Sequence, residues 1–368
     1  MALTNKKIFF YGPVGGKNGK IVGGGESGNK KTIFILKKLG FQLFLIEKPY
    51  PIKVPFFNFF VYFIQLFFVY LKFFFKIFFN KALTKDKIYF HLSGFYGHLI
   101  YIEWLYIKTC SFLNIKCIYE IRAGGAIEIY LNSNFIYKFF FKSILINSTK
   151  ILCQGFEYIG FVKSVANIDA VYYPNFILDQ FVYSYNSLDR NNSSIIQMVY
   201  FGRIAPSKNV DFILDICNNI SNNDFICEII GEGTPDYVQY LNNRIQILGL
   251  EHKVFILPPK NSQELFEILP NKHFFLFPSI EKREGHSNSL TEAMNFGVVP
   301  ISSYAGFNPS IIQDSNLLIN EYNPVNYANK IISIWDSKMW EMYSFQCSNI
   351  VKNNYTESVI KSTLYSLY

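Results

Sequence analysis

Features that would assign a chain to a familiar class are scarce in this sequence. It has six cysteines and five histidines in 368 residues, and the scattered cysteines lack the spacing of metal ligands. We therefore expect buried free thiols in a reducing compartment. Charged residues make up only 17% of the chain, but hydrophobic residues make up 50%, which excludes intrinsic disorder.

Motifs that read DNA or RNA are also missing, which argues against a nucleic-acid partner. The formal net charge of +8 nevertheless suits an anionic partner. Phosphate-bearing ligands and membrane surfaces therefore remain as candidate partners. Residues 1–7 lead directly into a predicted strand and lack the apolar region and cleavage site of a signal peptide. We expect a cytoplasmic protein.

Aromatic residues are abundant, with 39 Phe and 26 Tyr, and they are concentrated in the first half of the chain. The segment 56–79 consists mainly of Phe, Tyr, Leu, Ile and Val. This segment is long enough to span a bilayer. Three interpretations stay open: an interfacial helix lying on a membrane, a buried domain helix, and a transmembrane span. In the first, residues 56–87 would contact an anionic membrane surface. On a helix, the polar residues would form one narrow stripe, which consists of Asn58, Gln65, Lys72, Lys76 and Asn80.

Strand and helix patterns alternate along most of the chain. Such alternation predicts an α/β fold with parallel sheets covered on both faces. A polar stretch at 184–194 interrupts the pattern, and we place a domain boundary there. The predicted domains are 1–184 and 195–349, each large enough for its own core.

Two glutamates stand at a predicted loop-to-helix junction in the second domain. Glu284 follows a buried strand at 273–277, and Glu292 lies in the second turn of a helix that begins at Ser287 or Asn288. Free N–H groups at the helix start form an anion site between the two carboxylates. A nucleotide sugar carries a diphosphate and hydroxyl groups, and it fits this arrangement. The alternative is that both glutamates are solvated charges at a helix start.

Other strand ends of the same domain carry compatible groups. Arg203 and Lys208 follow a strand at 197–201 and could clamp a diphosphate. A tight turn containing Gly231 and Gly233 follows the next strand. Because the carboxyl ends of parallel strands meet at one edge of a sheet, we expect these groups to converge.

The first domain gives weaker signals. A glycine-rich loop from Gly15 and Gly16 to Gly28 precedes a predicted helix at about 29–39, but it matches neither a dinucleotide fingerprint nor a Walker A loop. His91 lies at a strand end, where a satisfied buried histidine is the common case. Arg122, also at a strand end, needs an anion, which is either Glu120 or a substrate.

Three runs, FGRIAPSKN at 201–209, IIGEGTP at 229–235 and FPSIEKREGHSNSLTEAMNFGVVPIS at 277–302, closely resemble the C-terminal domain of family 4 glycosyltransferases, the "glycosyl transferases group 1" domain. The resemblance implies a retaining enzyme of the GT-B fold, with two Rossmann-like domains that face each other over a cleft. The donor would bind the second domain and the acceptor the first. A helix within 350–368 would return to pack on the first domain.

The resemblance also implies roles for individual residues. Arg203 and Lys208 would hold the donor diphosphate, Glu284 the transferred sugar and Glu292 the ribose. Many family members have a histidine where this chain has the loop around Arg122, so the acceptor side departs from the family pattern. The further donor-binding residues would be Gly202, Gly231, Gly233, Ser287, Asn288 and Ser289, and the acceptor-side residues would be Gly15, Gly16, His91 and Arg122.

The chain contains no Asp-x-Asp motif, so neither a metal nor another cofactor is expected. We predict a hexosyltransferase that moves a sugar from a UDP- or GDP-linked donor to a glycan acceptor. A lipid-linked saccharide in cell-surface polysaccharide synthesis, at the cytoplasmic membrane face, is the predicted acceptor. The alternatives are a nucleotide-sugar epimerase and a non-catalytic sugar-nucleotide binding protein.

Overall fold

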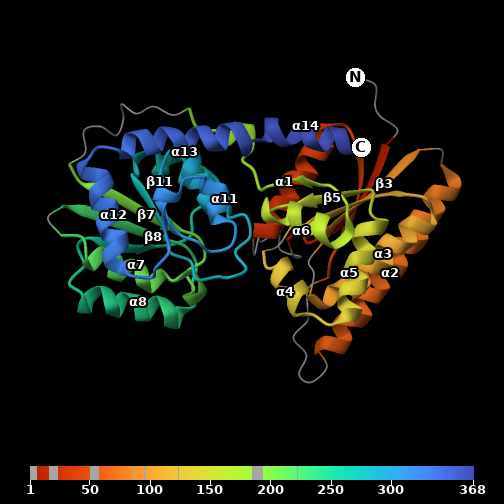
Figure 1. Cartoon of the computed structure of the whole chain (residues 1–368), viewed down its shortest axis with the longest axis horizontal. Coiled ribbons are helices and arrows are strands. Elements are labelled where there is room, and N and C mark those ends of the chain that lie inside the picture. The colour runs from red at the N-terminus through yellow and green to blue at the C-terminus, as the bar shows by residue number, and fades with distance from the viewer. Residues whose placement is uncertain are drawn as a thin grey trace. The chain divides into compact units, whose positions relative to one another are not determined.

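The computed structural model describes residues 6–15, 24–49, 58–84, 86–94, 97–122, 124–184, 194–221 and 223–368. The chain forms two compact units (Figure 1). Unit 1 comprises Met1–Phe176 and Glu357–Tyr368, and unit 2 comprises Ile177–Thr356. The division falls at Phe176, upstream of the polar stretch where we placed the boundary, and most of that stretch lies outside the described residues. Helix α14 (Glu357–Leu367) belongs to unit 1.

Unit 1 contains one parallel sheet in the order β2-β1-β3-β4-β5-β6. The central residues of its strands are mostly hydrophobic and buried, as expected when helices cover both faces of a sheet. The strands are β1 Lys6–Gly12, β2 Gln42–Glu47, β3 Lys87–Gly94, β4 Lys116–Ile121, β5 Lys150–Cys153 and β6 Ala170–Tyr172. The other helices of this unit are α1 Gly24–Lys38, α2 Asn58–Leu83, α3 Ile100–Phe112, α4 Ala126–Asn132, α5 Phe135–Asn147 and α6 Glu157–Ala166.

Helix α1 begins five residues before the predicted start at 29, so the prediction that Gly28 belongs to a loop was wrong. Gly28 lies inside the helix. A Cβ atom at this position would lie 1.8 Å from the Arg122 guanidinium. The glycine therefore makes room for a buried side chain, and packing overrides its low helix propensity.

Unit 2 contains a second parallel sheet in the order β12-β11-β10-β7-β8-β9. Its strands are β7 Ile196–Phe201, β8 Phe225–Ile230, β9 Val254–Leu257, β10 Phe274–Phe277, β11 Val299–Ser303 and β12 Leu318–Ile319. Its helices are α7 Val210–Asn218, α8 Pro235–Ile247, α9 Ser262–Ile268, α10 Asn288–Asn295, α11 Asn308–Ile312, α12 Pro324–Asp336 and α13 Trp340–Asn354.

Strand β7 lies in the middle of the second sheet, with β8 on one side and β10 on the other. The strand order reverses at this point, which is where open parallel sheets bind ligands at their carboxyl ends. The loops after β7, β8 and β10 carry the residues that the sequence singled out.

Candidate functional site

The turns after β7 and β8 pack backbone against backbone. The Ile204 N–H donates to the Glu232 carbonyl at 2.9 Å. A Cβ atom on Gly231 would lie 1.8 Å from the Gly202 carbonyl oxygen, so only glycine fits there. Gly202 itself has a φ of +146°. The predicted glycine turn therefore lies directly beside the loop that carries Arg203 and Lys208.

Lys208 and Glu284 are in direct contact. Lys208 ends a short 3-10 turn, Pro206–Lys208, and its Nζ donates to Glu284 Oε2. The Ser279 hydroxyl donates to the same carboxylate oxygen at 3.0 Å. Glu284 is only 9% exposed. Two predicted site residues that lie 76 positions apart in the sequence thus share one ion pair at the sheet's carboxyl edge.

Gly306 fixes the backbone of Glu284. It adopts a φ of +51°, and a Cβ atom there would lie 2.0 Å from the Glu284 carbonyl oxygen. Neither Gly306 nor Ser279 was predicted as part of the site. The available signals were modest: Ser279 follows β10 after one proline, and Gly306 follows β11 by three residues.

Helix α10 begins beside this ion pair, as predicted. Ser287 is the N-cap, and its hydroxyl accepts from the Leu290 N–H at 3.3 Å. Gly297, with a φ of +68°, follows the end of the helix. The N–H groups of Asn288 and Ser289, in the first turn, have no acceptor within the helix. Glu292 lies in the second turn and is half-buried.

Arg203 has an exposed side chain on the loop after β7. Its carbonyl accepts a hydrogen bond from the Tyr200 hydroxyl at 2.7 Å. Burial raises the pKa of Tyr200, and the charge of Glu284 raises it further. The tyrosine therefore stays a neutral donor that holds the loop, while the guanidinium remains available to a ligand.

In unit 1, Arg122 and His91 belong to one buried network. Arg122 forms an ion pair with Glu120 at 2.5 Å. His91 Nε2 lies 3.2 Å from the other Glu120 oxygen, and its Nδ1 lies 2.5 Å from the Tyr368 hydroxyl. All four side chains are buried. The anion that contacts Arg122 in this structure is therefore Glu120.

Further hydrogen bonds extend the network. The Arg122 guanidinium donates to Asn175 Oδ1 at 3.0 Å, and Gln154 donates to the same oxygen at 3.0 Å. Gly15, three residues after β1, has a φ of +98°. Gly16 lies outside the described residues.

Within the described ranges, no three His, Cys, Asp or Glu side chains are grouped as a metal site requires. All six cysteines are free and buried, which confirms the prediction of buried thiols. The second unit places two cations, the N–H groups of a helix start and two carboxylates at one sheet edge.

Comparison with known proteins identifies this domain. Residues 189–355 match the family model "Glycosyl transferases group 1". No curated protein sequence gives a significant match. Solved structures resemble the whole chain. HepE of Anabaena in complex with UDP has a TM-score of 0.73 and 12% identity, and the match covers 98% of each chain.

Two further structures resemble it similarly. Sucrose-phosphate synthase of Thermosynechococcus elongatus has a TM-score of 0.73 and 14% identity, covering 99% of this chain and 98% of that one. The apo form of the lipopolysaccharide outer core galactosyltransferase WaaB has a TM-score of 0.68 and 13% identity, covering 98% of each chain. The chain therefore has the GT-B fold, and its residues 189–355 are similar to the glycosyl transferases group 1 domain.

Proposed function

We propose that this protein is a retaining glycosyltransferase that uses a UDP- or GDP-linked sugar as donor. The observation that carries the proposal is the contact between Lys208 and Glu284 beside the start of α10. The family match supports it, as do the structural neighbours determined with UDP and with UDP-glucose.

Each group at this edge has a task in donor binding. Arg203, Lys208 and the first N–H groups of α10 attract the diphosphate. Glu292 accepts hydrogen bonds from the ribose hydroxyls. Glu284 accepts from a hydroxyl of the transferred sugar, and Lys208, Ser279 and Gly306 hold it in place.

The reaction needs the developing charge on the leaving diphosphate to be stabilised, and the two cations supply this without a metal. Glu284 is already engaged by Lys208 and Ser279, which makes it a poor nucleophile. We therefore favour attack by the acceptor hydroxyl on the face from which the diphosphate leaves. The bond from the anomeric carbon to the diphosphate breaks, the bond to the acceptor oxygen forms, and the acceptor proton passes to a diphosphate oxygen.

For the acceptor, we propose a glycan on a lipid carrier at the cytoplasmic membrane face, used in cell-surface polysaccharide synthesis. The proposal is supported by the net charge of +8 and by the aromatic-rich first unit. The acceptor choice is independent of the donor site, so it can fail while the donor assignment stands.

The donor assignment is tested with a panel of UDP- and GDP-sugars, scored by thermal shift and by donor hydrolysis. We expect one donor to stabilise the protein and to be hydrolysed slowly. Arg203→Ala should lower turnover by about 100-fold or more, because one lost charge-stabilising donor costs that much. The control is Lys352→Ala, an exposed lysine on α13, which should leave turnover unchanged.

Other outcomes of this experiment contradict the proposal. Conversion of the donor to an epimer without acceptor would show an epimerase. A thermal shift without turnover, with or without a lipid-linked acceptor, would show a binding protein. Normal turnover by Arg203→Ala at saturating donor would remove the clamp from the mechanism.

A further inference from the structure

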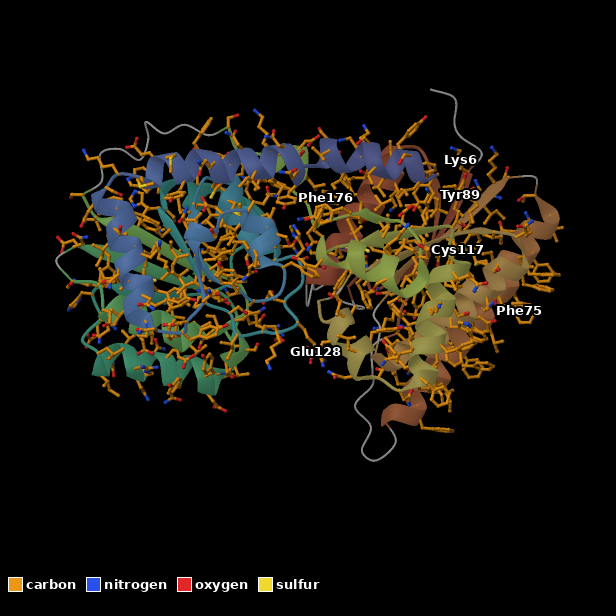
Figure 2. All side chains as sticks on the ribbon, viewed as in Figure 1. Lys6, Phe75, Tyr89, Cys117, Glu128 and Phe176 are labelled. Atoms are coloured by element: carbon orange, nitrogen blue, oxygen red, sulfur yellow. The ribbon has the colours of Figure 1, made fainter. Side chains whose placement is uncertain are left out.

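Helix α2 has two opposite apolar sides, and only one of them is packed. Its buried side consists of Leu66, Phe73 and Ile77, each at most 1% exposed. Phe73 contacts the rings of Phe90 and Tyr106 at centroid distances of 4.9 and 4.8 Å. The other side carries exposed residues, and Figure 2 shows Phe75 there, pointing away from the sheet. These exposed residues are Phe60, Ile64, Phe67, Phe68, Phe75, Phe78, Phe79 and Leu83.

Neighbouring helices extend this surface. Helix α3 contacts both α2 and α5, so the three helices form one layer beside the sheet (Figure 1). Helix α5 exposes Phe135 by 80% and Phe139 by 63%. We call the exposed apolar residues of α2 and α5 the aromatic face, which on α5 consists of Phe135, Ile136, Phe139 and Ile146.

Helices α2, α3 and α5 expose lysines but no acidic side chain. Neither α2 nor α5 contains an Asp or a Glu. In α3 the single acid, Glu103, is 1% exposed and accepts a hydrogen bond from Tyr119 at 2.8 Å. A surface that is both aromatic and basic is therefore complementary to an anionic one. The lysines of the three helices are Lys72, Lys76, Lys81, Lys108, Lys138 and Lys142.

The packing of α2 argues against a transmembrane span, although Phe60–Leu83 is long and apolar enough to be one. The helix is fixed to the unit by its buried side, from Leu66 to Ile77. The Tyr70 hydroxyl lies 2.7 Å from that of Thr109, and Lys76 lies over the Phe44 ring at 4.8 Å. A span would draw the attached sheet into the hydrocarbon, where its polar backbone edges are not tolerated.

A second copy of the chain is also a poor occupant. Two aromatic faces packed together would bring their lysines together, and like charges at an interface disfavour association. Anionic headgroups neutralise the same lysines while the rings enter the interfacial region.

We infer that the aromatic face docks unit 1 on an anionic lipid bilayer, with α2 and α5 lying in the plane of the membrane surface. Exposed apolar patches of this extent mark interaction sites on soluble proteins. The inference goes beyond sugar transfer and does not depend on it, since it concerns binding alone.

The test is co-sedimentation of the purified full chain with vesicles of phosphatidylcholine alone or mixed with phosphatidylglycerol. We expect binding to the anionic vesicles that weakens as salt rises. The double variant Phe68→Gln and Phe75→Gln should weaken binding at least about tenfold. The matched control is Phe345→Gln on α13 in unit 2, since Phe345 is 55% and Phe75 54% exposed.

A second variant tests the charge. Replacing Lys72 and Lys142 by Gln should weaken binding about fivefold per lysine, whereas Lys352→Gln should not change it. Circular dichroism should show that all variants fold. Failure to bind anionic vesicles at low salt, or equal binding by the phenylalanine variant and Phe345→Gln, overturns the inference. So does a dimer in solution that the phenylalanine variant converts to a monomer, or membrane binding that only detergent releases.

Discussion

Arg122 lies in the interior of unit 1, where a charged guanidinium is tolerated because Glu120 lies 2.5 Å away. Removing one partner of such a pair leaves the other buried and uncompensated. We predict that Arg122→Ala lowers the free energy of unfolding by about 3–5 kcal/mol. Urea denaturation followed by circular dichroism measures this loss.

Arg244 is the matched control, because its pair with Asp215, also at 2.5 Å, is on the surface. Their side chains are 24% and 33% exposed. Arg244→Ala should cost no more than about 1 kcal/mol. Equal losses for the two variants would contradict a structural role for the buried network.

Individual residues show which features of the site the sequence could predict. Lys208 and Glu284 were predicted to converge because they follow strands that read clearly as hydrophobic runs. Their ion pair was not predicted, since it depends on how two loops bend after their strands. The partner of Arg122 was left open for the same reason. Gly306 was missed because its role is to admit another segment's backbone, and nothing local records that.

Among the helices, α10 matters most for the anion site. Ser287 caps its start, where the free N–H groups lie, and Glu292 is in its second turn. Ser287→Ala removes the hydroxyl that accepts from Leu290. We predict a loss of about 1 kcal/mol in unfolding free energy and weaker binding of UDP. Chemical denaturation and calorimetric titration check the two effects.

Ser362→Ala is a suitable comparison for this prediction, because Ser362 is an exposed serine inside α14. It should change stability by less than about 0.5 kcal/mol. If Ser287→Ala is as stable as Ser362→Ala, the cap does not hold the start of α10.

For helix α2, the sequence predicted a helix but not the side that packs against the unit. Its length and its polar stripe were predicted, and a helix is present from Asn58 to Leu83. Periodicity could not decide which side packs, because apolar residues occur on most of its circumference. In the structure only part of the polar stripe lies beside the strands: Asn80 accepts from Lys7 at 3.5 Å, and Lys76 lies over the Phe44 ring. Lys72 is exposed together with the unpacked aromatic residues.

For the whole molecule, the fold was predicted from alternating strand and helix patterns, and the two parallel sheets confirm it. The strands predicted at 197–201 and 273–277 agree with β7 and β10 within one residue.

The division into two units leads to a prediction about where the donor binds. Added UDP should slow hydrogen exchange most in the segments 202–209, 231–235 and 284–292, because a ligand stabilises the region that it contacts. Mass spectrometry of peptic peptides measures this. Peptides from α2 and α5 provide the internal comparison. If the α2 and α5 peptides were protected most, the nucleotide would bind unit 1 and the prediction would be wrong.

Unit 1 is assembled from two distant parts of the chain, Met1–Phe176 and Glu357–Tyr368. The ribosome therefore synthesises the whole of unit 2 between the two parts of unit 1. All six strands of the unit 1 sheet precede unit 2 in the chain, but Phe41 and Tyr89 lack their contacts with Tyr368 until residues 357–368 have been made. During that interval the nascent chain is most prone to aggregation. Packing of Glu357–Tyr368 on the first part of unit 1 ends this vulnerable period.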